Sequence, residues 1–131
     1  MATIEEAVNT RMLGFSALTS LVGTRIYPLV VPQDVAMPAV AYQKISGIPQ
    51  RAHTGFSGLH QDRFQMTCEA DDYATAKAVE VALRHCWDNY VGTQGGVKIE
   101  AAQVTNSVDG FSDVHAAPVV RMDVMIWHNA A

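Results

Sequence analysis

The chain has 131 residues, of which 49% are hydrophobic and 17% charged, so it is long enough to fold around a core of its own. Thirteen acidic and nine basic residues give a net charge of −4, and Lys and Arg form no cluster, which argues against a protein that grips nucleic acid. We expect a single domain over residues 1–131, without a signal peptide or a membrane span, made in a reducing cytoplasm.

The N-terminal third predicts a helical segment and then an irregular crossover. Thr3 and Glu6 have the spacing of a capping box, and apolar residues recur at helical intervals over residues 4–22. Gly14 interrupts this pattern, so one helix with a soft point and two short helices are equally compatible with it. Three prolines between residues 28 and 38 predict a connection without regular structure.

The next segment predicts two strands joined by a long loop. The strands cover residues 40–46 and 59–69, and the loop between them, residues 47–58, is rich in Gly and Ser and contains Pro49. Alternate residues of the second strand are apolar and should face the core: Phe64, Met66 and Cys68. Residues 25–27 could add a short edge strand.

The C-terminal half predicts a helix and a second pair of strands. Asp71 or Asp72 caps the helix, which runs to about Tyr90. A strand follows over residues 97–105, with a bulge near residues 101–103 where the apolar alternation changes parity. Residues 106–117 predict a second long loop, and Pro118 opens a last strand with core-facing Val120, Met122, Val124 and Ile126.

The order of elements is helix, strand, strand, helix, strand, strand. This order predicts an α+β domain with a four-stranded antiparallel sheet, helices packed on one face, and two long hairpin loops. No catalytic, cofactor-binding or metal-binding residues are predicted. The five His residues lack the spacing of a metal site, and Cys68 and Cys86 lie on inward apolar stripes. The acidic residues near 69–72 are explained by capping of the second helix.

The two predicted loops and the outward sheet face carry the interface candidates. Each loop presents one aromatic residue among polar ones, and such a residue gains little unless something covers it. A partner protein and the domain itself are equally good candidates for that cover. The candidates are Arg51, His53 and Phe56 in the first loop, Asp109, Phe111 and Asp113 in the second, and Arg121, Met125 and Trp127 on the sheet.

Scattered positions along nearly the whole chain resemble the tail-completion, or tail-terminator, family of long-tailed bacteriophages and related phage-like particles. The longest such stretch begins with Leu21-Val22-Gly23-Thr24-Arg25-Ile26-Tyr27-Pro28. The resemblance continues through Val31-Pro32-Gln33, residues 38–47, Gly58-Leu59, residues 63–68, Tyr73 with Ala76 and Ala78, residues 95–99, and residues 121–128.

The resemblance implies a virion structural protein at the head-proximal end of the tail. Members form homo-oligomeric rings, typically hexamers, that cap the tail tube and dock on the head connector, the stopper protein, while DNA passes through the central channel without specific binding. It implies no cofactor and no enzymatic activity. The alternative hypothesis is a small cytoplasmic enzyme or ligand-binding domain of ferredoxin-like topology.

Overall fold

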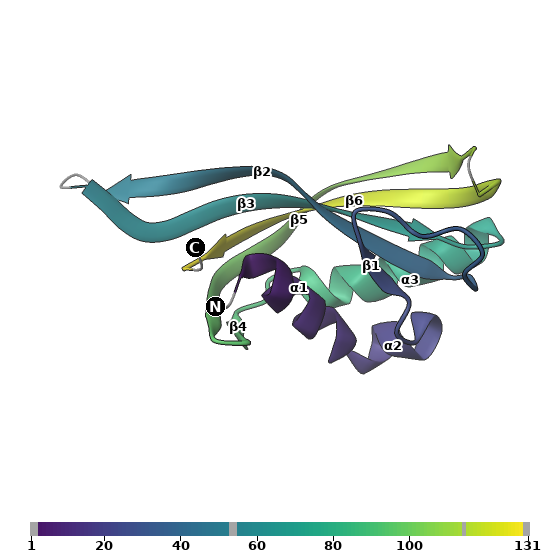
Figure 1. The fold of residues 1–131 in the computed structure, drawn as a ribbon, viewed down its shortest axis with the longest axis horizontal. Helices are drawn as coiled ribbons and strands as arrows, with labels where there is room; N and C mark the ends of the chain where they lie inside the picture. Colours follow the sequence, from purple (N-terminus) through teal and green to yellow (C-terminus); the bar gives the residue numbers. More distant parts are fainter. Residues whose placement is uncertain (1–2, 53–54, 114, 130–131) are drawn as a thin grey trace.

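A computed structural model gives the structure of the chain over residues 3–52, 55–113 and 115–129, with the side chains of residues 48–59 not described. A twisted sheet of six strands carries three helices on one of its faces (Figure 1). The helices are α1 (Ile4–Leu13), α2 (Ser16–Val22) and α3 (Tyr73–Trp87). The strands are β1 (Ile26–Pro28), β2 (Ala39–Ala52), β3 (Gly55–Glu69), β4 (Gly92–Gln94), β5 (Val97–Ser112) and β6 (Ala117–His128).

The sheet differs from the predicted four-stranded antiparallel sheet, and that prediction is wrong. The strand order is β1-β2-β3-β6-β5-β4, so one short strand is added at each edge. The added β1 runs parallel to β2, which makes the sheet mixed, whereas the other neighbours are antiparallel. The added β4 forms a hairpin with β5 through Gly95 and Gly96, whose positive φ angles of 56° and 85° suit a tight two-residue turn.

The helices begin and end at the signals in the sequence. Thr3 Oγ1 accepts a hydrogen bond from the Glu6 backbone N–H, and the Glu6 carboxylate accepts one from the Thr3 N–H, which completes the predicted capping box. The helical segment breaks at Gly14 into α1 and α2, the second of the two forms compatible with the sequence. Asp72 caps α3 by accepting the Thr75 N–H at 2.7 Å.

The core lies between the helices and one face of the sheet. Apolar side chains from β2, β3 and β6 stand side by side across this face, as in the row Tyr42, Met66 and Met122. Trp87 from α3 and Met12 from α1 pack against them and are fully buried. Arg11 ties α1 to the end of α3, because its guanidinium donates to the Cys86 carbonyl at 2.9 Å and lies over the Tyr90 ring.

Neither of the two long loops predicted from the sequence exists. Residues 47–58 mostly continue β2 and β3, which remain paired from Ile48 opposite Gln61 to Ala52 opposite Gly55. β6 pairs with β3 only from His60 onward, so the rest of the hairpin is a two-stranded arm that projects beyond the helices (Figure 1). We call residues 48–59 the β2–β3 arm.

The second predicted loop is likewise a hairpin. β5 continues to Ser112 and β6 begins at Ala117, so only residues 113–116 connect them. Register shifts occur between Ile99 and Ala101 and between Val104 and Asn106, on either side of the predicted bulge. This turn lies at the end of the sheet opposite the β2–β3 arm (Figure 1).

Both thiols are buried in the core, and we expect neither to react in the folded protein. Burial raises the pKa of Cys68 well above its ordinary value and that of Cys86 to about 12, which leaves almost no thiolate at neutral pH. Cys68→Ala should cost about 1 kcal/mol through lost packing and leave assembly unchanged. Labelling with a thiol reagent before and after unfolding tests this expectation. Fast labelling of native Cys86 would contradict it.

Candidate functional site

The β2–β3 arm carries the first group of predicted interface residues. Arg51 and Phe56 lie opposite each other on its two strands, while His53 lies outside the described residues. Among the residues that the structure describes, no helix lies over the arm and no third strand pairs with it (Figure 1). A two-stranded ribbon is marginally stable alone in water, so this segment is well suited to contacts with another protein.

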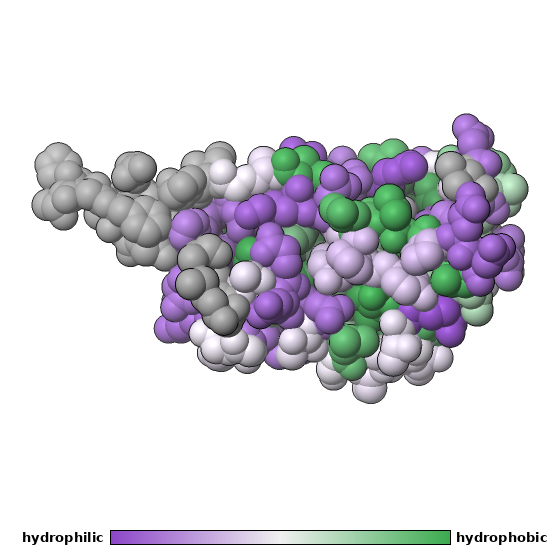
Figure 2. Space-filling model, in the orientation of Figure 1, coloured by the Kyte–Doolittle hydropathy of each residue, from purple (hydrophilic) through white to green (hydrophobic). Residues whose placement is uncertain are grey.

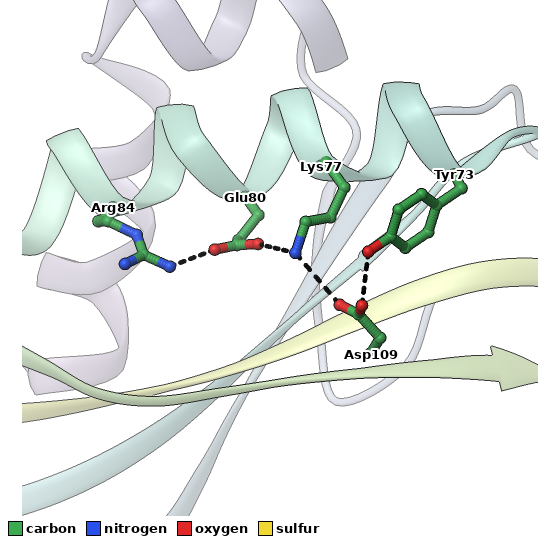
Figure 3. A network of polar contacts seen from close by, with 5 residues as sticks. All are labelled: Tyr73, Lys77, Glu80, Arg84 and Asp109. Atoms are coloured by element: carbon green, nitrogen blue, oxygen red, sulfur yellow. Dashed lines mark hydrogen bonds and ion pairs between the residues drawn. The ribbon is translucent and has the colours of Figure 1, made fainter.

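The second group lies on the β5–β6 hairpin, where the structure separates its members. Asp109 belongs to a polar network with α3 (Figure 3), in which it accepts hydrogen bonds from the Tyr73 hydroxyl at 2.6 Å and from Lys77 Nζ at 3.2 Å. Phe111 remains 59% exposed, and Asp113 is exposed in the turn. Phe111 and Asp113 are therefore available to a partner, whereas Asp109 already has partners in its own chain.

The network continues along α3 and braces the hairpin against the helix. Lys77 also pairs with Glu80 at 2.9 Å, and Arg84 pairs with the other oxygen of Glu80 (Figure 3). Hydrogen bonds to Glu80 and Asp109 raise the pKa of Lys77. Hydrogen bonds from Tyr73 and Lys77 lower the pKa of Asp109, so its carboxylate stays charged. The sequence reveals only the helical spacing of these side chains, not the link to β5.

The sheet face opposite the helices, which we call the outer face, carries the third group. Arg121, Met125 and Trp127 all lie there, partly buried. The Gln61 side chain contacts the Met125 sulfur at 3.5 Å, and Arg63 pairs with Asp123 at 2.7 Å beside it. Figure 2 shows the molecule from the side, and on that side apolar residues form small separate patches among polar ones. The outer face thus has the mixed character of a surface that a hydrated partner can cover.

Part of the outer face is covered by the crossover between β1 and β2, which leaves a groove of about 460 Å³. Residues 29–33 form one wall, and strands β2, β3 and β6 supply the floor, which includes Arg121. His115 Nδ1 lies 2.8 Å from the Glu69 carboxylate at the end of this groove. We did not predict this groove from the sequence, where the only available signal is the run of apolar Leu29, Val30 and Val31 between two prolines.

A second buried polar pair lies on the helix side, at the base of the β2–β3 arm. His128 Nε2 is 2.6 Å from Asp62 Oδ2, and both residues are almost completely buried. His60 stacks on His128 with 5.5 Å between ring centroids. Lys44 Nζ approaches Asp62 at 4.0 Å and Glu5 at 3.7 Å, so it lies between two carboxylates. This group was also missed, because its members come from distant parts of the chain.

In the described part of the chain, long stretches of β2 and of β5 have no neighbouring strand on the side that faces away from the centre of the sheet. β1 pairs only with residues 40–42 of β2, and β4 pairs only with residues 97–99 of β5. Asn89 N–H and the Asp88 side chain bond to Ala102 and Val104 of β5, but no strand pairs with β5 beyond Ile99 on that side. Unpaired edges of this length can accept a strand from another chain.

The described part of the chain contains no group of three His, Cys, Asp or Glu side chains arranged to hold a metal ion. Within the same residues, no helix has the length and apolar character needed to span a membrane. What the surface offers instead is a projecting arm, two strand edges and a groove. Features of this kind are suited to contacts with other polypeptides.

Comparison with known proteins gives a family for this chain. The model of the family "Tail completion protein gp17" matches residues 6–128. The chain belongs to the tail completion protein family. As a member it is a structural protein of a phage-type tail and a component of the virion, in agreement with the resemblance seen in the sequence. No curated protein matches the chain significantly.

Two solved structures have the same fold, and one of them is part of the virion of a gene transfer agent. A chain from the virion of a native gene transfer agent particle superposes with a TM-score of 0.77 at 18% sequence identity, covering 98% of this chain and 94% of that one. A second solved chain gives a TM-score of 0.62 at 15% identity, covering 98% and 93% of the two chains. At these identities the likeness concerns the fold of this tail completion protein and not its contacts.

Proposed function

We propose that this protein is the ring-forming terminator of the tail. Six copies would cap the tail tube, stop its growth and join it to the head connector, with DNA passing through the central channel. The family supports a role at the tail, and the strand edges described above support assembly into a ring. The protein would act without chemistry of its own, as a scaffold for these contacts.

The two unpaired edges are the observation that carries the ring. β2, β3, β6 and β5 alternate in direction, so β5 runs opposite to β2. Consider a head-to-tail ring whose axis runs along the strands. There β5 of one subunit would lie beside β2 of the next subunit, and the two strands would pair antiparallel. Such a contact is heterologous and closes by rotation.

The predicted interface residues have distinct places in this arrangement. We propose that Met125 and Trp127, on the outer face, are covered by a neighbouring subunit. Arg51, His53 and Phe56 would contact one axial partner, and Phe111 with Asp113 would contact the other. The tube protein and the connector protein are the two axial partners of such a ring.

A cryo-EM map of the assembled particle tests this proposal directly. It should show the protein as a single closed ring with an open axis between tube and connector. An isolated monomer, or a two-fold dimer with the same surface on both subunits, would refute the ring. The oligomeric state of the free protein in solution is a weaker test, because the ring can require contact with the tube in order to close.

We also expect the protein to bind duplex DNA weakly or not at all. Six copies carry a net charge of −24 (6 × −4), and basic residues form no cluster that would offset it. A wall of this charge repels phosphates and leaves the passage open. Titration of a short duplex at low salt checks the expectation. Sub-micromolar affinity with a steep dependence on salt would show that the protein grips DNA.

A further inference from the structure

The groove on the outer face contains a cation without a counterion. Arg121 is a floor residue of the groove, and its guanidinium makes no hydrogen bond or ion pair with any residue that the structure describes. The other arginine on this face, Arg63, is paired with Asp123 at 2.7 Å. The contrast matters because a partly buried guanidinium without an acceptor loses hydration and gains nothing in return.

Gly110 allows the guanidinium to lie where it does. A Cβ atom at this position would come within 2.5 Å of Arg121 Nη1, and Gly110 does not need glycine for its backbone conformation, because its φ is not positive. The missing side chain instead makes room for Arg121. Gly110 therefore leaves room for the Arg121 guanidinium beside β5.

The other charged groups of the groove already have partners within the chain. The Glu69 carboxylate contacts His115 Nδ1 and is 5% exposed, so it is not available to Arg121. The Arg121 guanidinium is therefore the group of the groove that can donate to an anionic oxygen.

The wall of the groove adds an apolar contact. Leu29 and Val30 are 65% and 69% exposed. Leu29 adopts a φ of 70°, which is costly for a bulky side chain, and its N–H is fixed to the Tyr42 carbonyl at 2.8 Å. Two large aliphatic side chains are therefore held in solvent beside the unpaired arginine. Aliphatic side chains in such a place gain free energy when a partner covers them.

We propose that this groove binds an acidic segment of a different virion protein, with a carboxylate on Arg121 and an aliphatic side chain against Leu29 and Val30. The proposal rests on the proposed function, since it names the chemistry of one axial contact. A peptide carboxylate fits better than DNA, because the groove places one guanidinium beside two exposed aliphatic side chains, whereas a polyanion needs a cluster of Lys and Arg that this sequence lacks. A different protein fits better than a second copy, because most of the groove lies at the end of the sheet near the β5–β6 turn; of its lining residues, Gln43 and Ser112 belong to the strand edges that would join copies.

Photocross-linking in assembled particles tests this assignment. A photoreactive phenylalanine analogue would replace Val30 at the groove, and Val91, which is 63% exposed on another part of the surface, would be the control position. We expect Val30, but not Val91, to cross-link to another virion protein at a peptide that contains Asp or Glu. Arg121→Gln should lower this cross-linking about tenfold, the usual effect of losing one partner of a charged hydrogen bond.

Two further variants separate binding from folding. Gly110→Ala keeps every charge but displaces the guanidinium, so it should weaken the cross-link as Arg121→Gln does while the melting temperature stays close to wild type. Arg63→Gln, on the same face, should leave the cross-link unchanged. The Arg121→Glu variant should form no cross-link from position 30. Replacing the identified acidic residue of the partner protein by Arg should restore the cross-link.

The outcomes distinguish this inference from the proposed function. A cross-link to another copy of the chain, a cross-link to DNA, or particles that complete normally with Arg121→Gln would overturn the acidic-segment assignment. If the protein occupies a ring at the head-proximal end of the tail but Val30 forms no cross-link, only the groove assignment fails. If particles do not contain the protein in such a ring, the proposed function itself fails.

Discussion

A protein whose residues 50–59 are replaced by Asn-Gly should fold normally but fail to complete tails. This change joins Pro49 to His60, which already lie opposite each other, by a turn that suits a two-residue hairpin. The arm lies beyond the helices (Figure 1), so its loss removes little of the core. We expect a shift in melting temperature within about 3 °C and a fall in complete particles on the order of 100-fold.

A thermal melt, together with electron micrographs of particles complemented with each variant, measures both effects. The matched control, Thr54→Gly, keeps the length of the arm and all of its proposed contact residues, and it should assemble normally. Phe56→Ala then asks whether the aromatic side chain of the arm carries the contact. If the shortened protein gives normal particles, the arm has no role in assembly. If the melting temperature of the shortened protein falls strongly, the arm contributes to the stability of the domain.

His128→Leu should destabilise the protein by about 3 kcal/mol, because it leaves the Asp62 carboxylate buried without its closest partner. A loss of this size corresponds to a fall in melting temperature on the order of 10 °C. Exchange of both residues, Asp62→Val with His128→Leu, should recover much of the loss, since no buried charge then remains. A single variant as stable as wild type would show that Lys44 or water satisfies Asp62 on its own.

The same pair makes the stability depend on pH in a defined direction. Burial lowers the pKa of His128, and the hydrogen bond with Asp62 offsets only part of this effect. Because the unfolded chain then binds the proton more readily, the contribution of His128 is complete above its ordinary pKa of about 6.5 and is lost as the pH falls. Melting temperatures between pH 8 and pH 5 should therefore fall more steeply for wild type than for the double variant.

The sequence predicted well those elements that local rules determine. The capping box at Thr3, the cap at Asp72 and the alternation of β3 and β6 each rest on a few neighbouring residues, and the structure confirms them. The parallel strand β1 was foreseen only as a possible edge. The pairing of β1 with β2 depends on the path of the crossover between these strands, and no local sequence pattern predicts that path.

The two hairpins were mistaken for loops because Gly and Pro were taken as signs of irregular backbone. Pro49 lies next to a register shift, in an edge part of β2, and these are the places where a strand tolerates proline. Gly110 is needed for Arg121 and not for a turn. The polar pairs of Asp62 with His128 and Glu69 with His115 join residues 66 and 46 positions apart, a distance over which a single sequence carries no signal.

The positions of the β2–β3 arm and the β5–β6 turn at opposite ends of the same strands give the molecule polarity (Figure 1). A subunit that lengthens a tube must offer at its upper end the same surface that it recognises at its lower end. A projecting two-stranded arm and a short turn beside a groove are different surfaces. One layer of such subunits would therefore seat in a single orientation, and it would present to the next component of the particle an end that differs from the end by which the layer is bound.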